Sequence, residues 1–257
     1  MKDKKQRGKI VSLDFDRDTE ISNINIDSDN NIIFSDEQGN RLTPKAVTTG
    51  DAYLRKKKPK VLRSASQDVN KIQLNLKKSL KKYDQLFFID TNFKKYESHY
   101  FCISSSFLGL WNNPEERRMI NIHPQPSLVF LSPIDSKPER FGWWDLIQRI
   151  KSSEVYQSNS SVGVVVDSDL GELSSINAGE TPVWGNNEIF RGFEFIYSSA
   201  DVGMGFWTNR IIKDCDKRSS TIHKLLEQQI PELIRQHPDL ENPVPLNYLN
   251  IKEDNKH

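Results

Sequence analysis

Apolar and polar residues alternate through the first part of the chain. The segments KIVSLDFD, ISNINID and NIIFSD, all within residues 9–42, show the two-residue period of half-buried strands, and Asp-Asn and Gln-Gly-Asn separate them as turns. Residues 43–64 are poor in apolar side chains, which is typical of a linker. The pattern therefore predicts an N-terminal arm of short strands with a basic linker over residues 1–64.

From residue 65 the apolar runs are longer and amphipathic stretches separate them. The apolar runs predict strands at 86–90, 99–106, 127–132, 161–167 and 189–197. The amphipathic stretches predict helices at 69–80, 139–151, 199–213 and 218–236. This order predicts an α/β domain, with a mixed sheet flanked by helices, over residues 65–236. Three prolines follow it, and we expect an irregular C-terminal tail over 237–257.

Three aspartates lie at the ends of these elements. Asp90 closes the strand LFFID, Asp167 closes the strand VGVVVD, and Asp201 opens the helix after FEFIYSSAD. If the first and fourth strands of the domain are adjacent and parallel, both strand carboxylates emerge at the same end of the sheet. Carboxylates held close together repel each other unless a cation lies between them. Oxygen ligands suit Mg²⁺ or Mn²⁺, and two such ions can activate a water and stabilise the leaving oxygen in phosphodiester cleavage.

Each acid also has an ordinary structural explanation. Asp167 suits a turn, and Asp201 suits the first turn of a helix, where a negative charge is favourable. Asp90 is harder to explain in this way, because Thr91-Asn92 already supplies turn chemistry. The coincidence of all three acids with element ends favours a shared site.

The order of strand with Asp, hairpin, helix, strand with Asp, strand, and helix with an early Asp resembles the ribonuclease H-like (RNase H-like) superfamily. Within it, the chain is similar to a bacterial family of uncharacterised domains, many found near mobile-element and defence genes. In that family the first strand ends in Asp-Glu-Ser-Gly, and the last helix opens near Gln-x-Ala-Asp. The counterparts here are FFIDTN followed by YFCISSSF, and FIYSSADVGMGFWTNRIIK, so Thr91-Asn92 departs from the acidic second position. The resemblance covers roughly residues 84–215.

This resemblance implies a metal-dependent nuclease that acts on DNA or RNA, in phage defence or mobile-element biology. It implies Asp90, Asp167 and Asp201 as the catalytic metal ligands. A fourth carboxylate is usual in active RNase H-like sites, and the spacing leaves its identity open. The candidates are Glu139, Asp145, Glu154 and Asp169.

Two other functions remain open. The departure at Thr91-Asn92 and the unassigned fourth ligand favour a catalytically inactive RNase H-like subunit that binds nucleic acid or a partner protein in a larger complex. Asp167 and Asp169 also form an Asp-x-Asp pair after an apolar strand, which sugar-nucleotide transferases use to hold Mn²⁺ and a diphosphate. No glycine-rich or uridine-recognition feature in the N-terminal half supports that third reading.

The net charge of only +1 conceals an uneven distribution of charge along the chain. Residues 52–82 contain eleven Lys and Arg and a single acid, Asp68. Such a run can bind phosphates by counterion release, or it can be a solvated face. Trp143, Trp144, Trp184 and Trp207 could stack on bases, although aromatic residues more often fill cores. The candidate nucleic-acid-binding residues are Arg55, Lys56, Lys57, Lys58, Lys60 and Arg63.

The composition is typical of a soluble protein, with 36% hydrophobic and 28% charged residues and a mean hydropathy of −0.64. No run approaches the roughly 18 apolar residues that a membrane helix needs, and the basic N-terminus lacks the apolar region of a secretory signal. Two cysteines fit a reducing compartment. We therefore expect a cytoplasmic protein with no membrane partner.

Overall fold

The structure is a computed structural model of the 257-residue chain. It describes residues 11–14, 21–26, 32–43, 45–48, 81–96, 98–153, 156, 160–167, 173–178, 192–197 and 207–250. Several predictions lie outside the described residues. They are the helix at 69–80, Asp169, Asp201, Glu154 and the basic residues Arg55, Lys56, Lys57, Lys58, Lys60 and Arg63.

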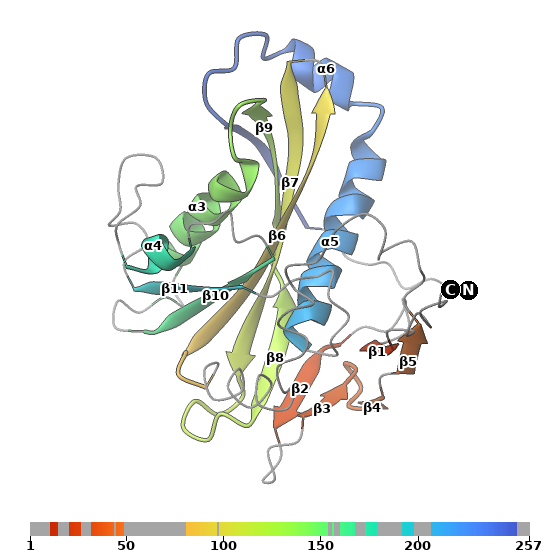
Figure 1. Ribbon diagram of the computed structural model, residues 1–257, viewed down its shortest axis with the longest axis vertical. Coiled ribbons are helices and arrows are strands. Elements are labelled where there is room, and N and C mark those ends of the chain that lie inside the picture. Colours follow the sequence, from red (N-terminus) through yellow and green to blue (C-terminus); the bar gives the residue numbers. More distant parts are fainter. Residues whose placement is uncertain are drawn as a thin grey trace, which may run out of the picture.

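One large mixed sheet organises the protein (Figure 1). Its ten strands are β2 (Asn23–Ile26), β3 (Ile32–Ser35), β4 (Arg41–Leu42), β6 (Gln85–Tyr96), β7 (His99–Trp111), β8 (Met119–Pro124), β9 (Ser127–Pro133), β10 (Val162–Val166), β11 (Phe193–Tyr197) and β12 (Val244–Leu249). The main path is β11-β10-β6-β7-β8-β2-β3-β4, while β9 pairs with β7 and β12 pairs with β9. β10 runs parallel to β6 and β11, and the other pairs are antiparallel. β1 (Val11–Asp14) and β5 (Lys45–Thr48) form a separate antiparallel pair.

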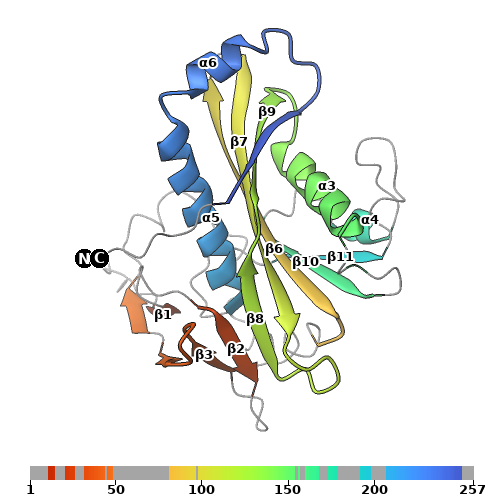
Figure 2. The same cartoon turned by 180° about the vertical axis from the view of Figure 1, so that it is seen from behind.

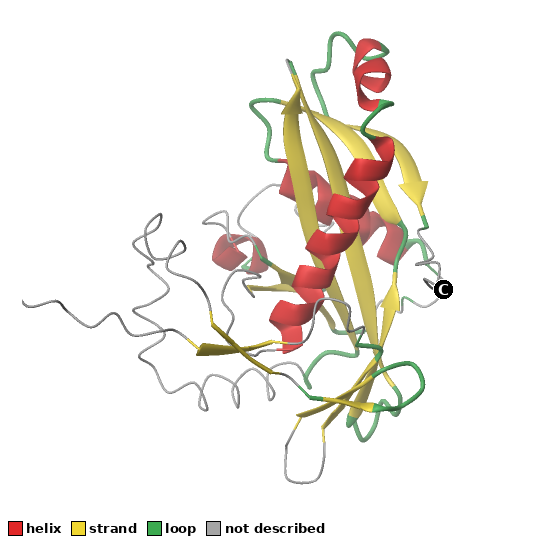
Figure 3. Ribbon diagram, turned by 90° about the vertical axis from the view of Figure 1, so that its right-hand side faces the viewer, coloured by secondary structure: helices red, strands yellow, loops and turns green. Residues whose placement is uncertain are grey.

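Helices α3 (Pro138–Lys151) and α5 (Trp207–Leu226) cover opposite faces of this sheet (Figures 1 and 3). Side chains alternate between the two faces of a strand, so neighbouring residues of β6 enter different cores. Phe87 and Ile89 join the core with Trp143 of α3, whereas Phe88 joins the core with Ile212 of α5. Two shorter helices, α4 (Leu173–Asn177) and α6 (Ile230–Arg235), complete the described helices. The predicted α/β class with a mixed sheet is confirmed.

The first strand of the domain is longer than predicted. β6 does not end at Asp90 but continues through Thr91 and Asn92, and it pairs with β7 as far as Tyr96. The assignment of Thr91-Asn92 to a turn was therefore wrong. Thr91 stays in the strand because its buried hydroxyl bonds the hydroxyl of Ser104 across the pair at 2.6 Å. The expected parallel pairing with the fourth strand is confirmed, with Val166 of β10 opposite Ile89 of β6.

The C-terminal helices also differ from the prediction, which placed a break near 214–217. α5 runs through this region without interruption. The buried side chains Ile211, Cys215, Ser219 and Ile222 recur at the helical period, so one continuous face packs on the sheet. None of the described helices is both long and apolar enough to cross a membrane.

Two segments, one early and one late in the chain, join the sheet more closely than expected. The prediction of an irregular tail was wrong over residues 244–249, because β12 pairs with β9 along its length (Figure 2). A register shift after Pro245 accommodates the proline within this strand. β2 pairs with β8, so the predicted strands at β2 and β3 extend the main sheet, whereas the predicted strand at β1 pairs with β5 in a separate sheet.

Candidate functional site

Asp90 and Asp167 lie side by side where β10 ends. Val166, the last residue of β10, is opposite Ile89, so the next residue on each strand is an aspartate. Asp90 is only 7% exposed, and its carboxyl group forms a hydrogen bond with that of Asp167. The parallel pairing therefore brings these two predicted site residues together, as the sequence pattern indicated.

The surroundings of Asp90 disfavour its ionised form. Burial raises its pKa most, and the negative charges of Asp167 and then Asp216 raise it further, as does the hydrogen bond to Asp167. The backbone N–H of Thr91 acts in the opposite direction, and the pKa of Asp90 lies at about 8. Without a cation, this pair of acids therefore retains a proton near neutral pH.

A third acid, Asp216, comes from α5. Asn92 of β6 donates from Nδ2 to Oδ1 of Asp216 at 2.7 Å and to its backbone carbonyl at 3.2 Å. These bonds hold Asp216 at the exposed rim, close enough for its charge to raise the pKa of Asp90. The sequence pattern predicts Asp201 as the helix acid, and Asp201 lies outside the described residues. The helical period of the buried residues 211, 215, 219 and 222 is the signal that could have indicated Asp216.

Glu139 approaches from the other face of the sheet, in the first turn of α3. Burial raises the pKa of Glu139, and the charge of Asp167 raises it further. Of the two candidates for the fourth acid that lie among the described residues, Glu139 is therefore the one close enough to Asp167 for the two charges to interact. Asp145 is engaged elsewhere, because it accepts hydrogen bonds from Nε of Arg149 (2.9 Å) and from the hydroxyl of Tyr248 (2.7 Å).

The chemistry of these four acids suits a hard divalent cation. Each offers carboxylate oxygens, which are the ligands that Mg²⁺ and Mn²⁺ prefer. In geometry only the Asp90–Asp167 pair is in direct contact. Within the part of the chain that the structure describes, no group of three or more His, Cys, Asp and Glu side chains is arranged to hold a metal ion. The pair is therefore the centre of the candidate site, with Asp216 and Glu139 on either side.

Polar contacts fix α5 over this part of the sheet. Ser105 of β7 lies directly opposite Asp90, and it accepts a hydrogen bond from Ser219 of α5 at 2.8 Å. The hydroxyl of Ser105 also bonds that of Ser127 at 2.9 Å, and Nε of Arg218 donates to Ser127 at 3.2 Å. All three serines are fully buried. Buried hydroxyl groups specify their partners more narrowly than apolar contacts do, so this network sets the helix position that presents Asp216.

α3 approaches the opposite face closely at Gly142. A Cβ atom there would lie 2.2 Å from Oγ of Ser104 and 2.6 Å from Oγ1 of Thr91. A residue without a side chain is therefore needed for α3 to pack at this depth. The close packing places Glu139, one turn earlier, near the end of β10.

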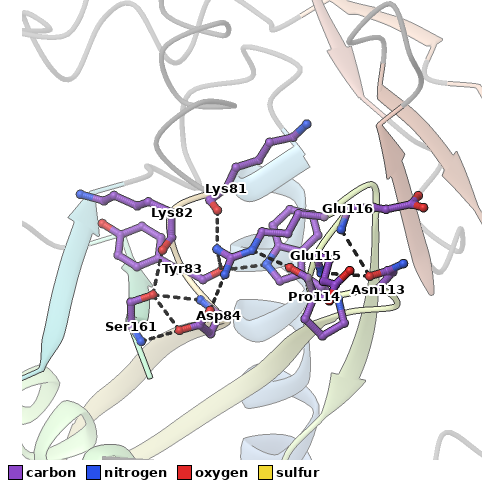
Figure 4. Close-up of polar contacts among 11 residues, drawn as sticks. Lys81, Lys82, Tyr83, Asp84, Asn113, Pro114, Glu115, Glu116 and Ser161 are labelled. Carbon is purple, nitrogen blue, oxygen red and sulfur yellow. Dashed lines mark hydrogen bonds and ion pairs between the residues drawn. The ribbon is translucent and has the colours of Figure 1, made fainter. Parts of the chain in front are cut away.

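A second polar cluster lies at the opposite end of the parallel strands (Figure 4). Ser161 donates to Oδ2 of Asp84 from its backbone N–H (2.7 Å) and from its hydroxyl (3.0 Å). The guanidinium of Arg117 pairs with Asp84 and donates to the carbonyls of Lys81 and Tyr83. These contacts join the starts of β6 and β10 to the turn before β8. The polar groups of this cluster form hydrogen bonds with one another and with the backbone, which indicates a structural role.

Comparison of the chain with known protein families and with curated proteins found no match. Trp143, one of the aromatic residues considered for base stacking, is 2% exposed and belongs to the core beneath α3. Trp184 lies outside the described residues.

Proposed function

We propose that the protein is a divalent-metal-dependent nuclease with an RNase H-like fold. The observation that carries the proposal is the contact between Asp90, which is buried, and the half-buried Asp167, two acids whose charges disfavour each other. A folded protein bears such a penalty when a cation or a reaction requires the arrangement. Structural roles account poorly for Asp90, because it lies mid-strand and serves neither as a cap nor as a turn residue.

The arrangement of elements supports the RNase H-like part of the proposal. A long antiparallel hairpin, β6–β7, is followed by β8, β9 and α3, and β10 then runs parallel to β6 on the side opposite β7. α5 covers the face opposite α3 and delivers an acid to the same end of β10.

In this proposal Asp90 and Asp167 would hold the divalent cation, which would supply Lewis-acid activation of water and of the scissile phosphodiester. Asn92 orients Asp216 toward the same place through two hydrogen bonds. Glu139 has a raised pKa and borders Asp167, so it is suited to accept and return a proton. Burial of Asp90 excludes water from one side of the pair and strengthens its electrostatic interactions.

Cleavage assays test this function. Purified protein with Mg²⁺ or Mn²⁺ is incubated with labelled single-stranded DNA, single-stranded RNA, both duplexes and an RNA–DNA hybrid. We expect cleavage of at least one substrate, loss of cleavage with EDTA, and a loss of at least a hundredfold for Asp90→Asn and for Asp167→Asn. Asp239→Asn, at an exposed carboxyl near the C-terminus, is the matched control. Cleavage that survives both site substitutions would refute the proposal.

A non-catalytic subunit that binds nucleic acid is the second candidate. It is favoured by one observation, namely that only two of the acids are in contact and no three-acid group is formed within the described residues. The same assays separate the candidates. Binding of nucleic acid without cleavage, for every substrate and both metals, would favour the non-catalytic role.

A further inference from the structure

The row of β6 side chains that begins at Asp90 continues beside α5. Side chains alternate between the two faces of a strand, so every second residue after Asp90 lies on the same face. The members of this row are Asp90, Asn92, Lys94 and Tyr96. Asn92 contacts Asp216 of α5, and Tyr96 contacts His223, about two turns further along that helix. The row therefore leads away from Asp90 on the side of the sheet that α5 covers (Figure 3).

Three side chains that can bind an anion meet at the far end of this row. The hydroxyl of Tyr96 and Nε2 of His223 share a hydrogen bond of 3.2 Å, and the two rings stack with their centroids 6.2 Å apart. Nζ of Lys94 lies 5.6 Å from the centroid of the Tyr96 ring. Lys94 is exposed, and the other two side chains are partly exposed. An ammonium group, an imidazole and a phenol hydroxyl thus share one surface patch, the Lys94 patch.

No carboxylate neutralises the charge of Lys94 within the part of the chain that the structure describes. None of the ion pairs formed there includes Lys94, and its contact with Tyr96 leaves the ammonium charged. Burial lowers the pKa of His223, the charge of Lys94 lowers it further, and the charge of Glu227 raises it. The positive charge of Lys94 therefore acts on a second group that can itself become positive, an arrangement that an anion would stabilise.

The spacing between the Lys94 patch and Asp90 suits a nucleic-acid backbone. Lys94 follows Asp90 by four residues of strand, which corresponds to roughly 13 Å at about 3.3 Å per residue. Phosphates of one strand follow each other every 3.4 Å or so along a helix axis. A strand with one phosphate at Asp90 therefore brings a second phosphate, about four positions away, to Lys94.

We propose that Lys94, Tyr96 and His223 bind a backbone phosphate of a nucleic acid, DNA or RNA, about four phosphates away from the one held at Asp90 and Asp167. This inference rests on the proposed function and assigns the path of its substrate, along the α5 side of β6. Lys94 supplies the positive charge, and the hydroxyl of Tyr96 and the ring of His223 supply hydrogen bonds to the phosphate oxygens.

Lys95 is a matched control on the next residue of the same strand. It is exposed like Lys94, but it lies on the opposite face of the sheet. Its partner across the hairpin is Tyr100, which packs against the core that contains Phe141 of α3. A general attraction of nucleic acid to positive charge requires both lysines equally, whereas the proposed path requires only Lys94.

Binding measurements without cleavage test the inference. All variants are made in the Asp90→Asn protein and titrated in EDTA into fluorescein-labelled oligo(dT), oligo(U) and duplexes, with fluorescence anisotropy as the readout. For the form that binds best, Lys94→Gln should weaken binding by about tenfold at low salt and flatten the salt dependence by about one unit of slope. Lys95→Gln should change the affinity by less than about twofold, since its charge points away from the strand.

Two further substitutions separate phosphate binding from a structural effect. Lys94→Arg keeps the charge and should retain the affinity and the salt slope. Tyr96→Phe keeps the stacked ring and removes only the hydroxyl, so it should weaken binding by about threefold, the effect of one hydrogen bond. Equal losses in Lys94→Gln and Lys95→Gln, no loss in either, or no binding of any nucleic acid would overturn the inference.

The pKa of His223 gives an independent readout by NMR of its ring protons. His223→Asn identifies the signal among those of the five histidines. Oligo(dT) should raise this pKa, because a bound phosphate favours the imidazolium form. Inorganic phosphate and dTMP at the same phosphate concentration should raise it less, because neither can also reach Asp90→Asn. A shift as large with inorganic phosphate as with oligo(dT), or no shift with oligo(dT), would refute binding of a backbone phosphate at this patch.

The inference and the proposed function fail in different ways. If binding depends on Lys94 but the wild-type protein cuts no substrate with either metal, then hydrolysis is refuted and the phosphate site stands. If the wild-type protein and Lys94→Gln cut nucleic acid with the same kcat/KM at every salt concentration, then the nuclease stands and the phosphate site is refuted.

Discussion

The carboxyl groups of Asp90 and Asp167 form a hydrogen bond across two parallel strands, although both side chains are acids. Mutual repulsion and burial both disfavour ionisation of Asp90, so the pair lowers the stability of the metal-free protein near neutral pH. A divalent cation between the carboxylates would remove most of this penalty. The relationship therefore predicts a change in stability that can be measured without any substrate.

Mg²⁺ or Mn²⁺ should raise the melting temperature of the wild-type protein. A ligand that binds only the folded state at 100 times its dissociation constant stabilises by about 2.7 kcal/mol, which corresponds to roughly 5–10 °C for a chain of this size. Asp90→Asn and Asp167→Asn should each lose most of this shift, because each removes one of the two charges in the pair. Differential scanning fluorimetry with and without EDTA measures the effect.

The control for this experiment is Asp239→Asn, whose shift should equal that of the wild-type protein. A shift of equal size in all four proteins would mean that the cations act elsewhere on the molecule. That result would contradict a metal centre at Asp90 and Asp167.

Asp216→Asn should weaken cleavage and metal binding, whereas Asp214→Asn should not. The two aspartates lie on the same helix, but Asp214 pairs with Arg210 at 3.2 Å, and Asp216 accepts hydrogen bonds from Asn92 near the acidic pair. We expect at least a tenfold loss in metal affinity for Asp216→Asn, measured by titration with Mn²⁺. Equal effects of the two substitutions would indicate a general charge effect and not a ligand role.

Elements with a strong local pattern could be predicted from the sequence alone. The apolar run VGVVV predicts β10, and the amphipathic stretch at 139–151 predicts α3. In both segments the buried positions form a regular pattern along the chain that is visible without knowledge of distant partners. The parallel pairing of the two apolar runs predicts that Asp90 and Asp167 are neighbours, since each aspartate directly follows a pair of aligned residues, Ile89 and Val166.

Features that depend on distant partners could not be predicted. Thr91 and Asn92 look like turn residues, but their partners Ser104 and Asp216 lie on β7 and α5 and keep them in β6. Asp216 was missed because a presumed break in α5 concealed the helical period that places it beside Asn92. The pattern does not reveal β12 because Pro238, Pro243 and Pro245 suggest an irregular tail, and only pairing with β9 makes residues 244–249 a strand.

Gly142→Ala should destabilise the protein. In a helix interior alanine is favoured over glycine by about 1 kcal/mol, but here the added Cβ would lie 2.2 Å from Oγ of Ser104. Overpacking of this kind costs about 1–3 kcal/mol or more, so we expect a net loss of stability in urea unfolding. Because α3 would move away from the sheet and carry Glu139 with it, the proposed nuclease activity should also fall.

Removal of the Ser104 hydroxyl group should restore part of the stability that Gly142→Ala loses. Ser104→Ala deletes the nearest atom, and Thr91 Oγ1 then remains as the next contact at 2.6 Å. The double variant Gly142→Ala/Ser104→Ala should therefore be more stable than the sum of the two single changes in unfolding free energy predicts. A double-mutant cycle measures this difference. Strict additivity would contradict direct contact at this position.

Asp84→Asn should destabilise the protein at neutral pH and have a smaller effect in acid. The backbone N–H of Ser161 is the main cause that lowers the pKa of Asp84, and the hydroxyl of Ser161 and the charge of Arg117 lower it further. A carboxyl group with a lowered pKa in the folded state contributes stability above its unfolded value of about 3.9, and that contribution is lost as the pH falls through the folded-state value. Because the Asp84 side chain is 39% exposed, solvent screening limits the loss to about 1 kcal/mol. Urea unfolding of both proteins at pH 7 and pH 3 measures the difference, which should be smaller at pH 3 than at pH 7. A difference of the same size at both pH values would show that Asp84 acts through packing and not through its charge.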